Sequence, residues 1–191
     1  THTELLDNNL LSYGLSLSKE LDQRFSHNTI AAKMTDVPGH TLALVPHLAK
    51  AGVFFLHIGV NGSSPLPKVP PLFVWRAPTG EEIIVQYDAS YGSSETIGDL
   101  EDLLVIENSA DNAGPPSTKQ VLEVYERLRK RYPQARIVAS SLDDYARAIL
   151  SYKDRLVIVE DEIGDTWIHG IGSDPYKVSA YKCLTRLGGQ W

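Results

Sequence analysis

The stretches TIAAKMTD (residues 29–36) and VFFLHI (residues 53–58) decide the fold class of this chain. Each is a short, mostly apolar run of the kind found in buried β-strands. The residues between them, 41–50, have a helical pattern, with Pro46 in or near the first turn, where proline is tolerated. A strand, a helix and a second strand in this order predict a parallel βαβ unit.

The rest of the chain continues this alternation. Further strands are expected at residues 72–76, 82–87, 102–106, 136–139 and 156–159. Further helices are expected at residues 8–25, 117–131 and 141–150, and after Asp174-Pro175. The long loops follow strands, and in βα barrels the loops after strands build the active site. The sequence therefore predicts an α/β fold with a parallel βα barrel, in one domain that covers residues 1–191.

The composition narrows the kind of partner. The chain has 191 residues, 42% of them hydrophobic and 22% charged, which is typical of a globular protein. A net charge of -6 argues against a nucleic acid partner, and no apolar run approaches the roughly 20 residues of a membrane span, so no membrane partner is expected. Cys183 is the single cysteine, so a metal site would have to use histidines and carboxylates.

Polar side chains gather where the expected strands end. These residues are Asp36, His57, Asp88, Tyr91, Glu107, Asp111, Ser140, Ser141, Glu160, Asp161, Glu162 and His169. The carboxyl ends of parallel strands meet at one edge of a sheet, so we expect many of these side chains to lie close together. Such an edge suits a polyhydroxylated or metal-bound substrate.

Two carboxylates at such an edge can act as nucleophile and general acid on a glycosidic bond. One must be ionised while the other is held protonated, and a divalent metal helps to keep the first ionised. His169 is the natural ligand candidate that is not a carboxylate. The spacing alone leaves open which acid takes which role.

The same residues also have structural interpretations. Asp36 precedes a Pro-Gly turn and could cap a helix, and Asp111 lies in a turn-rich segment where aspartate is favoured. His57 could be a packed strand residue. Trp75 could stack on a sugar or lie in the core.

Four segments together resemble glycoside hydrolase family 38, the α-mannosidases, and more closely an uncharacterised branch of that superfamily. Residues 36–41, DVPGHT, resemble the family's Asp-Pro-Phe-Gly-His-Ser motif, and residues 72–76 with Thr79-Gly80 resemble its Phe-Trp-Trp segment and turn. Residues 111–116, DNAGPP, resemble its glycine-rich loop, and residues 168–173, IHGIGS, resemble its histidine motif. The order of the segments agrees with the family.

The resemblance implies a retaining, metal-dependent glycosidase with a carbohydrate substrate. It implies that Asp36 is both nucleophile and zinc ligand, that Asp111 is the general acid/base and that His169 is a second zinc ligand. Trp75, Tyr91 and His57 are the expected substrate contacts. In a retaining site the two carboxyl groups lie about 5–5.5 Å apart. The implied fold is the seven-stranded barrel of glycoside hydrolases and deacetylases.

The family's first-strand His-x-Asp pair, which completes its zinc site, has no counterpart here. We therefore expect an incomplete portion of the barrel, with the first βα units in a missing N-terminal segment of the same protein. Two alternatives remain open. One is a non-catalytic carbohydrate-binding relative, and the other is a metal-dependent carbohydrate deacetylase, in which a metal-bound water attacks an ester or amide.

Overall fold

The structure is a computed structural model that describes residues 3–36, 40–62, 66–92, 96–109, 112–164 and 174–188. In chain order, its elements are η1 (Thr3–Leu5), α1 (Asn8–Phe25), β1 (Ala31–Thr35), α2 (Leu44–Lys50), β2 (Phe55–Gly59), β3 (Leu72–Arg76), β4 (Glu82–Asp88), α3 (Thr118–Arg131), α4 (Leu142–Ile149), η2 (Leu150–Arg155), β5 (Ile158–Val159) and α6 (Pro175–Gly188).

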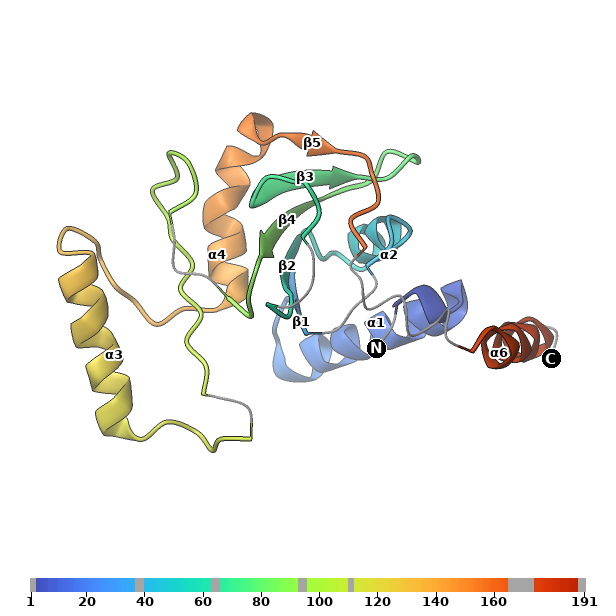
Figure 1. Cartoon of the computed structure of the whole chain (residues 1–191), viewed down its shortest axis with the longest axis horizontal. Helices are drawn as coiled ribbons and strands as arrows, with labels where there is room; N and C mark the ends of the chain where they lie inside the picture. The colour runs from blue at the N-terminus through green and yellow to red at the C-terminus, as the bar shows by residue number, and fades with distance from the viewer. Residues whose placement is uncertain are drawn as a thin grey trace.

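Among the described residues, five strands form one sheet in the order β1-β2-β4-β3-β5 (Figure 1). The pairs β1–β2, β2–β4 and β3–β5 are parallel, and β3–β4 is antiparallel. The antiparallel pair is a hairpin formed by the two strands expected at residues 72–76 and 82–87, and its turn contains Gly80 at a φ of +96°, a conformation that costs glycine little. The predicted α/β class with a mostly parallel sheet is confirmed.

Local capping explains where the helices begin. The Ser117 and Ser141 side chains each accept a hydrogen bond from the backbone N–H three residues on, and Gln120 and Asp144 accept one in return. These reciprocal bonds are capping boxes, and they begin α3 and α4 where the sequence predicted helices from residues 117 and 141. The Asp174 carboxylate accepts from the Lys177 backbone N–H at 3.0 Å and caps α6 in the same way.

The core has one layer on each face of the sheet. On the face covered by α1 and α2, here the α2 face, strand residues such as Leu56, Trp75 and Val85 pack against helix residues such as Leu48. On the opposite face, here the α4 face, the buried residues are Ile30, Ala31, Phe55, Leu72, Ile84, Tyr145, Ala146 and Ile149. Alternate side chains of each strand therefore enter different layers, as the pleat requires.

Two predicted strands, 102–106 and 136–139, are wrong, because the structure has no strand in either range. Leu104 packs beside the α4-face cluster from an irregular segment, while Val138 is 56% exposed. An apolar run predicts that its side chains are buried, but it does not show that the segment pairs with a strand. A strand also needs a neighbouring backbone, and the described sheet offers neither range a partner.

Strand direction separates acids that were expected together. The strand β3 runs against β4, and β5 runs parallel to β3, so the carboxyl end of β5 lies at the sheet edge opposite the carboxyl ends of β1, β2 and β4. Glu160, just after β5, pairs there with Arg76 at 3.3 Å. The expectation that Glu160 shares an edge with Asp36 is wrong. Glu162 lies further along and accepts from the Leu42 backbone N–H at 2.7 Å, near the start of α2.

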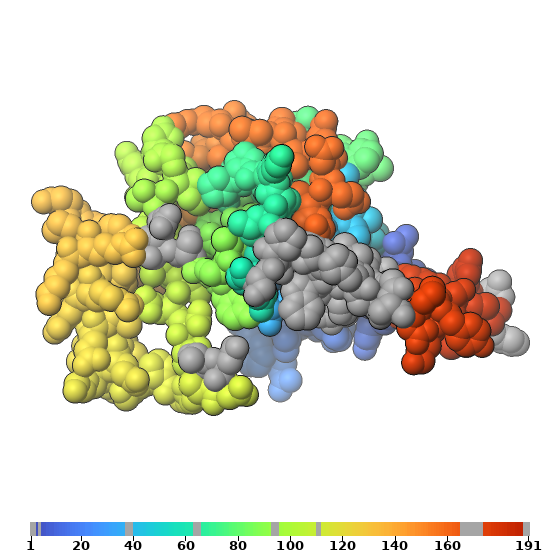
Figure 2. Space-filling view, viewed as in Figure 1, coloured from blue at the N-terminus to red at the C-terminus, as the bar shows by residue number. Residues whose placement is uncertain are grey.

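The helices α3 and α6 stand away from the sheet, at opposite ends of the molecule (Figures 1 and 2). Lys182 of α6 donates to the Leu5 carbonyl at 2.8 Å, while Tyr176 on the same helix is 83% exposed. Within the described ranges, the structure contains no helix with the length and apolar character needed to span a membrane.

Candidate active site at the carboxyl edge of the sheet

The carboxyl edge formed by β1, β2 and β4 brings three polar side chains together. Asp36 follows β1, Asn61 follows β2 and Tyr91 follows β4. The Asn61 amide donates to Asp36 Oδ1 at 3.3 Å and to the Tyr91 hydroxyl at 3.4 Å. Asp36 is exposed, so its carboxylate is available to a ligand.

Backbone geometry sets the position of Asp36. Its N–H donates to the Gly59 carbonyl at 2.9 Å and so continues the β1–β2 ladder by one residue. Its φ of +58° then turns the chain out of the strand direction. Aspartate adopts this left-handed conformation more readily than most residues that carry a Cβ. The carboxylate therefore stands at the end of the strand, beside the loop that follows β2.

The loop after β4 lies directly over the end of β2. A Cβ at Gly59 would stand 2.8 Å from the Ser90 carbonyl oxygen and 2.9 Å from the Tyr91 Cα. Only glycine at position 59 allows the two backbones to come this close. This contact places Tyr91 beside Asn61 and Asp36.

Beneath this edge, a polar row crosses the α4 face. Strand register sets Lys33 opposite His57, and His57 opposite Gln86. His57 is fully buried, and its Nε2 lies 2.6 Å from Asp88 Oδ2. Its Nδ1 lies 3.0 Å from Lys33 Nζ, which also donates to the Tyr91 carbonyl at 2.7 Å.

The partners of His57 determine its tautomer. A lysine ammonium has only donors, so Nδ1 accepts from Lys33, and Nε2–H donates to the Asp88 carboxylate. Burial lowers the pKa of Lys33, and the nearby Asp88 partly opposes this shift. The imidazole thus lies between the half-buried Lys33 ammonium and the buried Asp88 carboxylate, and each has a hydrogen-bond partner.

The charge of Asp88 also affects Tyr145 on α4, the helix that covers this face of the sheet. Burial raises the pKa of Tyr145 on α4, and the Asp88 and Asp102 carboxylates raise it further. Tyr145 also packs its ring edge-on against Phe55, with the ring centroids 5.6 Å apart. His57, Gln86 and Asp88 of this row are therefore buried behind the apolar layer on the α4 side, while Lys33 is half-buried.

The predicted site residues have different places in the structure. Asp36 and Tyr91 lie together at the carboxyl edge, joined through Asn61. His57 lies behind that edge as a buried link. Trp75 is fully buried on the α2 face, opposite Ile83 at the other end of β4, and its indole N–H donates to the Asp161 carbonyl. Asp111 and His169 lie outside the described residues.

Sequence reasoning missed Lys33 and Asn61. Lys33 interrupts the apolar run of β1, and a charged residue within a buried strand usually has a partner, so this signal was present. Its partner could be recognised only from the register that sets Lys33 beside His57. Asn61 lies in a loop rich in Gly, Ser and Pro, and no pattern distinguishes it there.

A zinc site would need more ligands than this edge supplies. The resemblance implies Asp36 and His169 as metal ligands, and only Asp36 lies in the described part of the chain. In that part, no group of three histidine, cysteine, aspartate or glutamate side chains is arranged to hold a metal ion. The described residues therefore do not by themselves make a zinc site.

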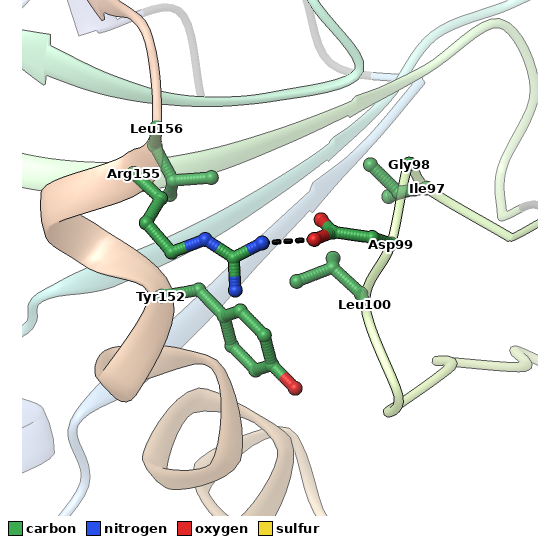
Figure 3. A pocket seen from close by; sticks show the side chains of 7 residues that line it. All are labelled: Ile97, Gly98, Asp99, Leu100, Tyr152, Arg155 and Leu156. Atoms are coloured by element: carbon green, nitrogen blue, oxygen red, sulfur yellow. Dashed lines mark hydrogen bonds and ion pairs between the residues drawn. The ribbon is translucent and has the colours of Figure 1, made fainter.

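A hollow of about 140 Å³ lies elsewhere, between the segment 97–100 and η2 (Figure 3). The Arg155 guanidinium spans it to pair with Asp99 and also stacks on the Tyr152 ring, 5.4 Å from its centroid. Both charged side chains are more than half exposed, so the pair adds little energy and already satisfies its own charges. None of the predicted site residues lines this hollow.

Comparison with models of known protein families gives no match for this chain, and comparison with curated proteins gives none either.

Proposed function

We propose that the carboxyl edge of the sheet is the catalytic centre of a glycoside hydrolase resembling the α-mannosidases, with Asp36 as nucleophile. One observation supports this above all: the exposed Asp36 carboxylate is held by the Asn61 amide, next to the Tyr91 hydroxyl. A neutral donor directs a carboxylate without cancelling its charge, as a nucleophile requires. Amide and phenol groups beside it suit the hydroxyl groups of a sugar.

The proposed reaction retains the configuration of the sugar. Because Asn61 binds Asp36 Oδ1, Oδ2 is the oxygen that attacks the anomeric carbon as the bond to the leaving oxygen breaks. Asp111 is the proposed acid that gives this oxygen its proton. Water then cleaves the glycosyl ester on Asp36, and Asp111 takes a proton from that water. A divalent metal, when bound, would add charge that keeps Asp36 ionised.

We also propose that the sheet is part of a larger parallel barrel. The parallel order β1-β2-β4 and the gathering of Asp36, Asn61 and Tyr91 at its carboxyl edge support this proposal. The strand β1 is at the edge of the sheet, so further strands of the same protein would join there.

The test compares the full-length protein with Asp36→Asn. An aryl α-mannoside is the substrate, with and without added zinc, and sugar binding is measured separately by calorimetry. We expect Asp36→Asn to lower hydrolysis on the order of 10³-fold or more and to leave binding within a few fold, because the amide cannot attack. The control is Asp154→Asn, an exposed carboxylate in η2, which should leave both values unchanged.

Other outcomes distinguish the alternatives. Release of acetate from an acetylated sugar, with no mannoside hydrolysis, would favour a deacetylase. Sugar binding by the wild type without turnover of either substrate would favour a non-catalytic relative. Equal hydrolysis by wild type and Asp36→Asn would contradict a nucleophilic role for Asp36.

A further inference from the structure

A continuous chain of polar contacts joins the interior of the sheet to the exposed carboxylate at its edge. From inside to outside, its members are Asp88, His57, Lys33, Tyr91, Asn61 and Asp36. Tyr91 is the joint in this chain, because its carbonyl accepts from Lys33 while its hydroxyl accepts from Asn61. The buried half and the exposed half therefore meet at a single loop residue.

We propose that Lys33 is a positioning residue whose ammonium holds the loop after β4 in the place where Tyr91 meets Asn61 and Asp36. The contact that carries this is the 2.7 Å hydrogen bond from Lys33 Nζ to the Tyr91 carbonyl. A hydrogen bond from a charged donor is about twice as strong as a neutral one. The role in catalysis rests on the proposed function, while the role in holding the loop does not.

The other contacts of the loop after β4 show why the Lys33 hydrogen bond is needed. The loop packs against Gly59, which has no side chain that could form a contact with it. Next to that contact, the Val60 N–H donates to the Asp88 carbonyl at 3.2 Å, and the Gly92 N–H reaches the Ser90 hydroxyl at 3.5 Å. Both distances are longer than the 2.7 Å contact from the charged Lys33 donor to the Tyr91 carbonyl.

The groups around Lys33 stabilise its ammonium in this position. His57 faces it from β2 as an acceptor, and Asp88 on β4 supplies the compensating negative charge through that imidazole. On α4, Tyr145 lies in the field of Asp88 and of Asp102. Removing the ammonium would leave the Tyr91 carbonyl and His57 Nδ1 without their donor, so the loop would lose its anchor.

The experiment measures hydrogen–deuterium exchange of the Val60 and Gly92 amides. Lys33→Met keeps an unbranched side chain that is one atom shorter, and it removes the ammonium. We expect exchange at both amides to rise about tenfold or more, the effect of losing one charge-assisted hydrogen bond. Lys33→Arg keeps a charged donor and should recover at least part of the protection.

Lys19→Met is the matched control. Lys19 is also a half-buried lysine that donates to a carbonyl, that of Thr29 at 2.8 Å, and to a carboxylate, that of Asp22 at 3.2 Å. Its loss should raise exchange near Thr29 and leave Val60 and Gly92 unchanged. Equal exchange at Val60 and Gly92 in wild type and Lys33→Met, or an equal rise there in Lys19→Met, would overturn the proposal.

A second measurement starts from the wild type, in which no substitution can impair folding. In the wild type, protection factors of Val60 and Gly92 should fall with rising pH before an ordinary lysine would titrate, while amides of β2 stay protected. Lys33→Arg should keep its protection across the same range, because guanidinium stays charged. Protection that is independent of pH in the wild type would contradict the role of the ammonium.

Measurements of hydrolysis distinguish the role of Lys33 from the proposed role of Asp36. If the wild type hydrolyses a mannoside, Lys33→Met should lower kcat more than it raises KM, because Asp36 loses its support while the substrate still binds. If no turnover is found, the exchange results still decide the role of Lys33. If turnover exists but exchange in Lys33→Met is unchanged, the positioning role fails while the proposed function stands.

Discussion

Asp22, near the end of α1, shows how a single carboxylate can link local structure to pH. The Thr29 hydroxyl donates to it at 2.7 Å, the Thr29 backbone N–H at 2.9 Å and Lys19 at 3.2 Å. These bonds, the one from the Thr29 hydroxyl above all, lower the pKa of Asp22 from 3.8 to about 2. All of them favour the ionised form.

The shift predicts how stability depends on pH. A pKa that is lower in the folded state means that the unfolded state binds the proton more tightly. The contribution of Asp22 is therefore full above about pH 4 and is lost as the pH falls toward about 2. In urea unfolding, Asp22→Asn should be less stable than wild type at neutral pH, and the difference should shrink through that window. If the urea midpoints of wild type and Asp22→Asn fell by equal amounts as the pH is lowered, the prediction would be contradicted.

His57 and Trp75 show the limits of reading function from residue type. Both were predicted to contact substrate, and both are fully buried. His57 faces Lys33 and Asp88 because the pleat directs residues 55 and 57 to the α4 face. Trp75 lies in the core layer on the other face, away from the carboxyl edge. Residue type identified a polar or aromatic group, and its place in the sheet decided what the group contacts.

At the scale of elements, Asp143 joins α4 to β1. Its Oδ1 accepts from the Ile30 and Ala31 backbone N–H groups, each at 2.9 Å, and its Oδ2 lies 3.0 Å from His27 Nε2. The two backbone donors lie at the start of β1, an edge strand of the described sheet, and no described strand runs along its outer side. The carboxylate from the first turn of α4 satisfies them instead.

Asp143→Ala should therefore cost about 2–4 kcal/mol in the free energy of unfolding, because it leaves two buried N–H groups without an acceptor. The neighbouring Asp144→Ala is the matched control. It removes only the exposed half of a capping box, so it should cost about 1 kcal/mol or less. Urea unfolding measures the free energy of both variants. Equal losses of stability would contradict the proposal that Asp143 connects α4 to β1.

Among the predicted elements, those with a local signal were found most reliably. The bounds of α1 agree with the predicted residues 8–25, and capping boxes mark the starts of α3 and α4. The apolar runs 102–106 and 136–139 resembled strands, but in the described part of the chain no strand forms in either range. Capping depends on residues within one turn, whereas strand formation depends on a distant part of the chain.

At the scale of the whole molecule, α1 has a stripe of large apolar side chains that the rest of the described chain does not cover. It consists of Leu10, Tyr13, Leu17, Leu21 and Phe25, each between 42% and 68% exposed. Leu11 and Leu15, on the other side of the helix, pack against the α2-face core. An exposed apolar patch of this kind lowers solubility.

Replacing Leu21 and Phe25 by glutamate should reduce aggregation, measured by light scattering, and leave the free energy of unfolding within about 0.5 kcal/mol of wild type. The control is Leu15→Glu on the same helix. It puts a charge against the core and should destabilise the fold by about 2 kcal/mol or more. A similar loss of stability from the surface pair would mean that the stripe is covered in solution.

The sequence by itself determined the α/β class, most helices and strands, and the place of Asp36 at a strand end, because these depend on short-range periodicity and capping. Only the tertiary structure decided which strand ends share an edge. The reversal of β3 and β5 sends Glu160 to the opposite side, while register brings Lys33 to His57. Direction and register depend on pairing between strands far apart in the chain, and a pattern within one strand does not contain that information.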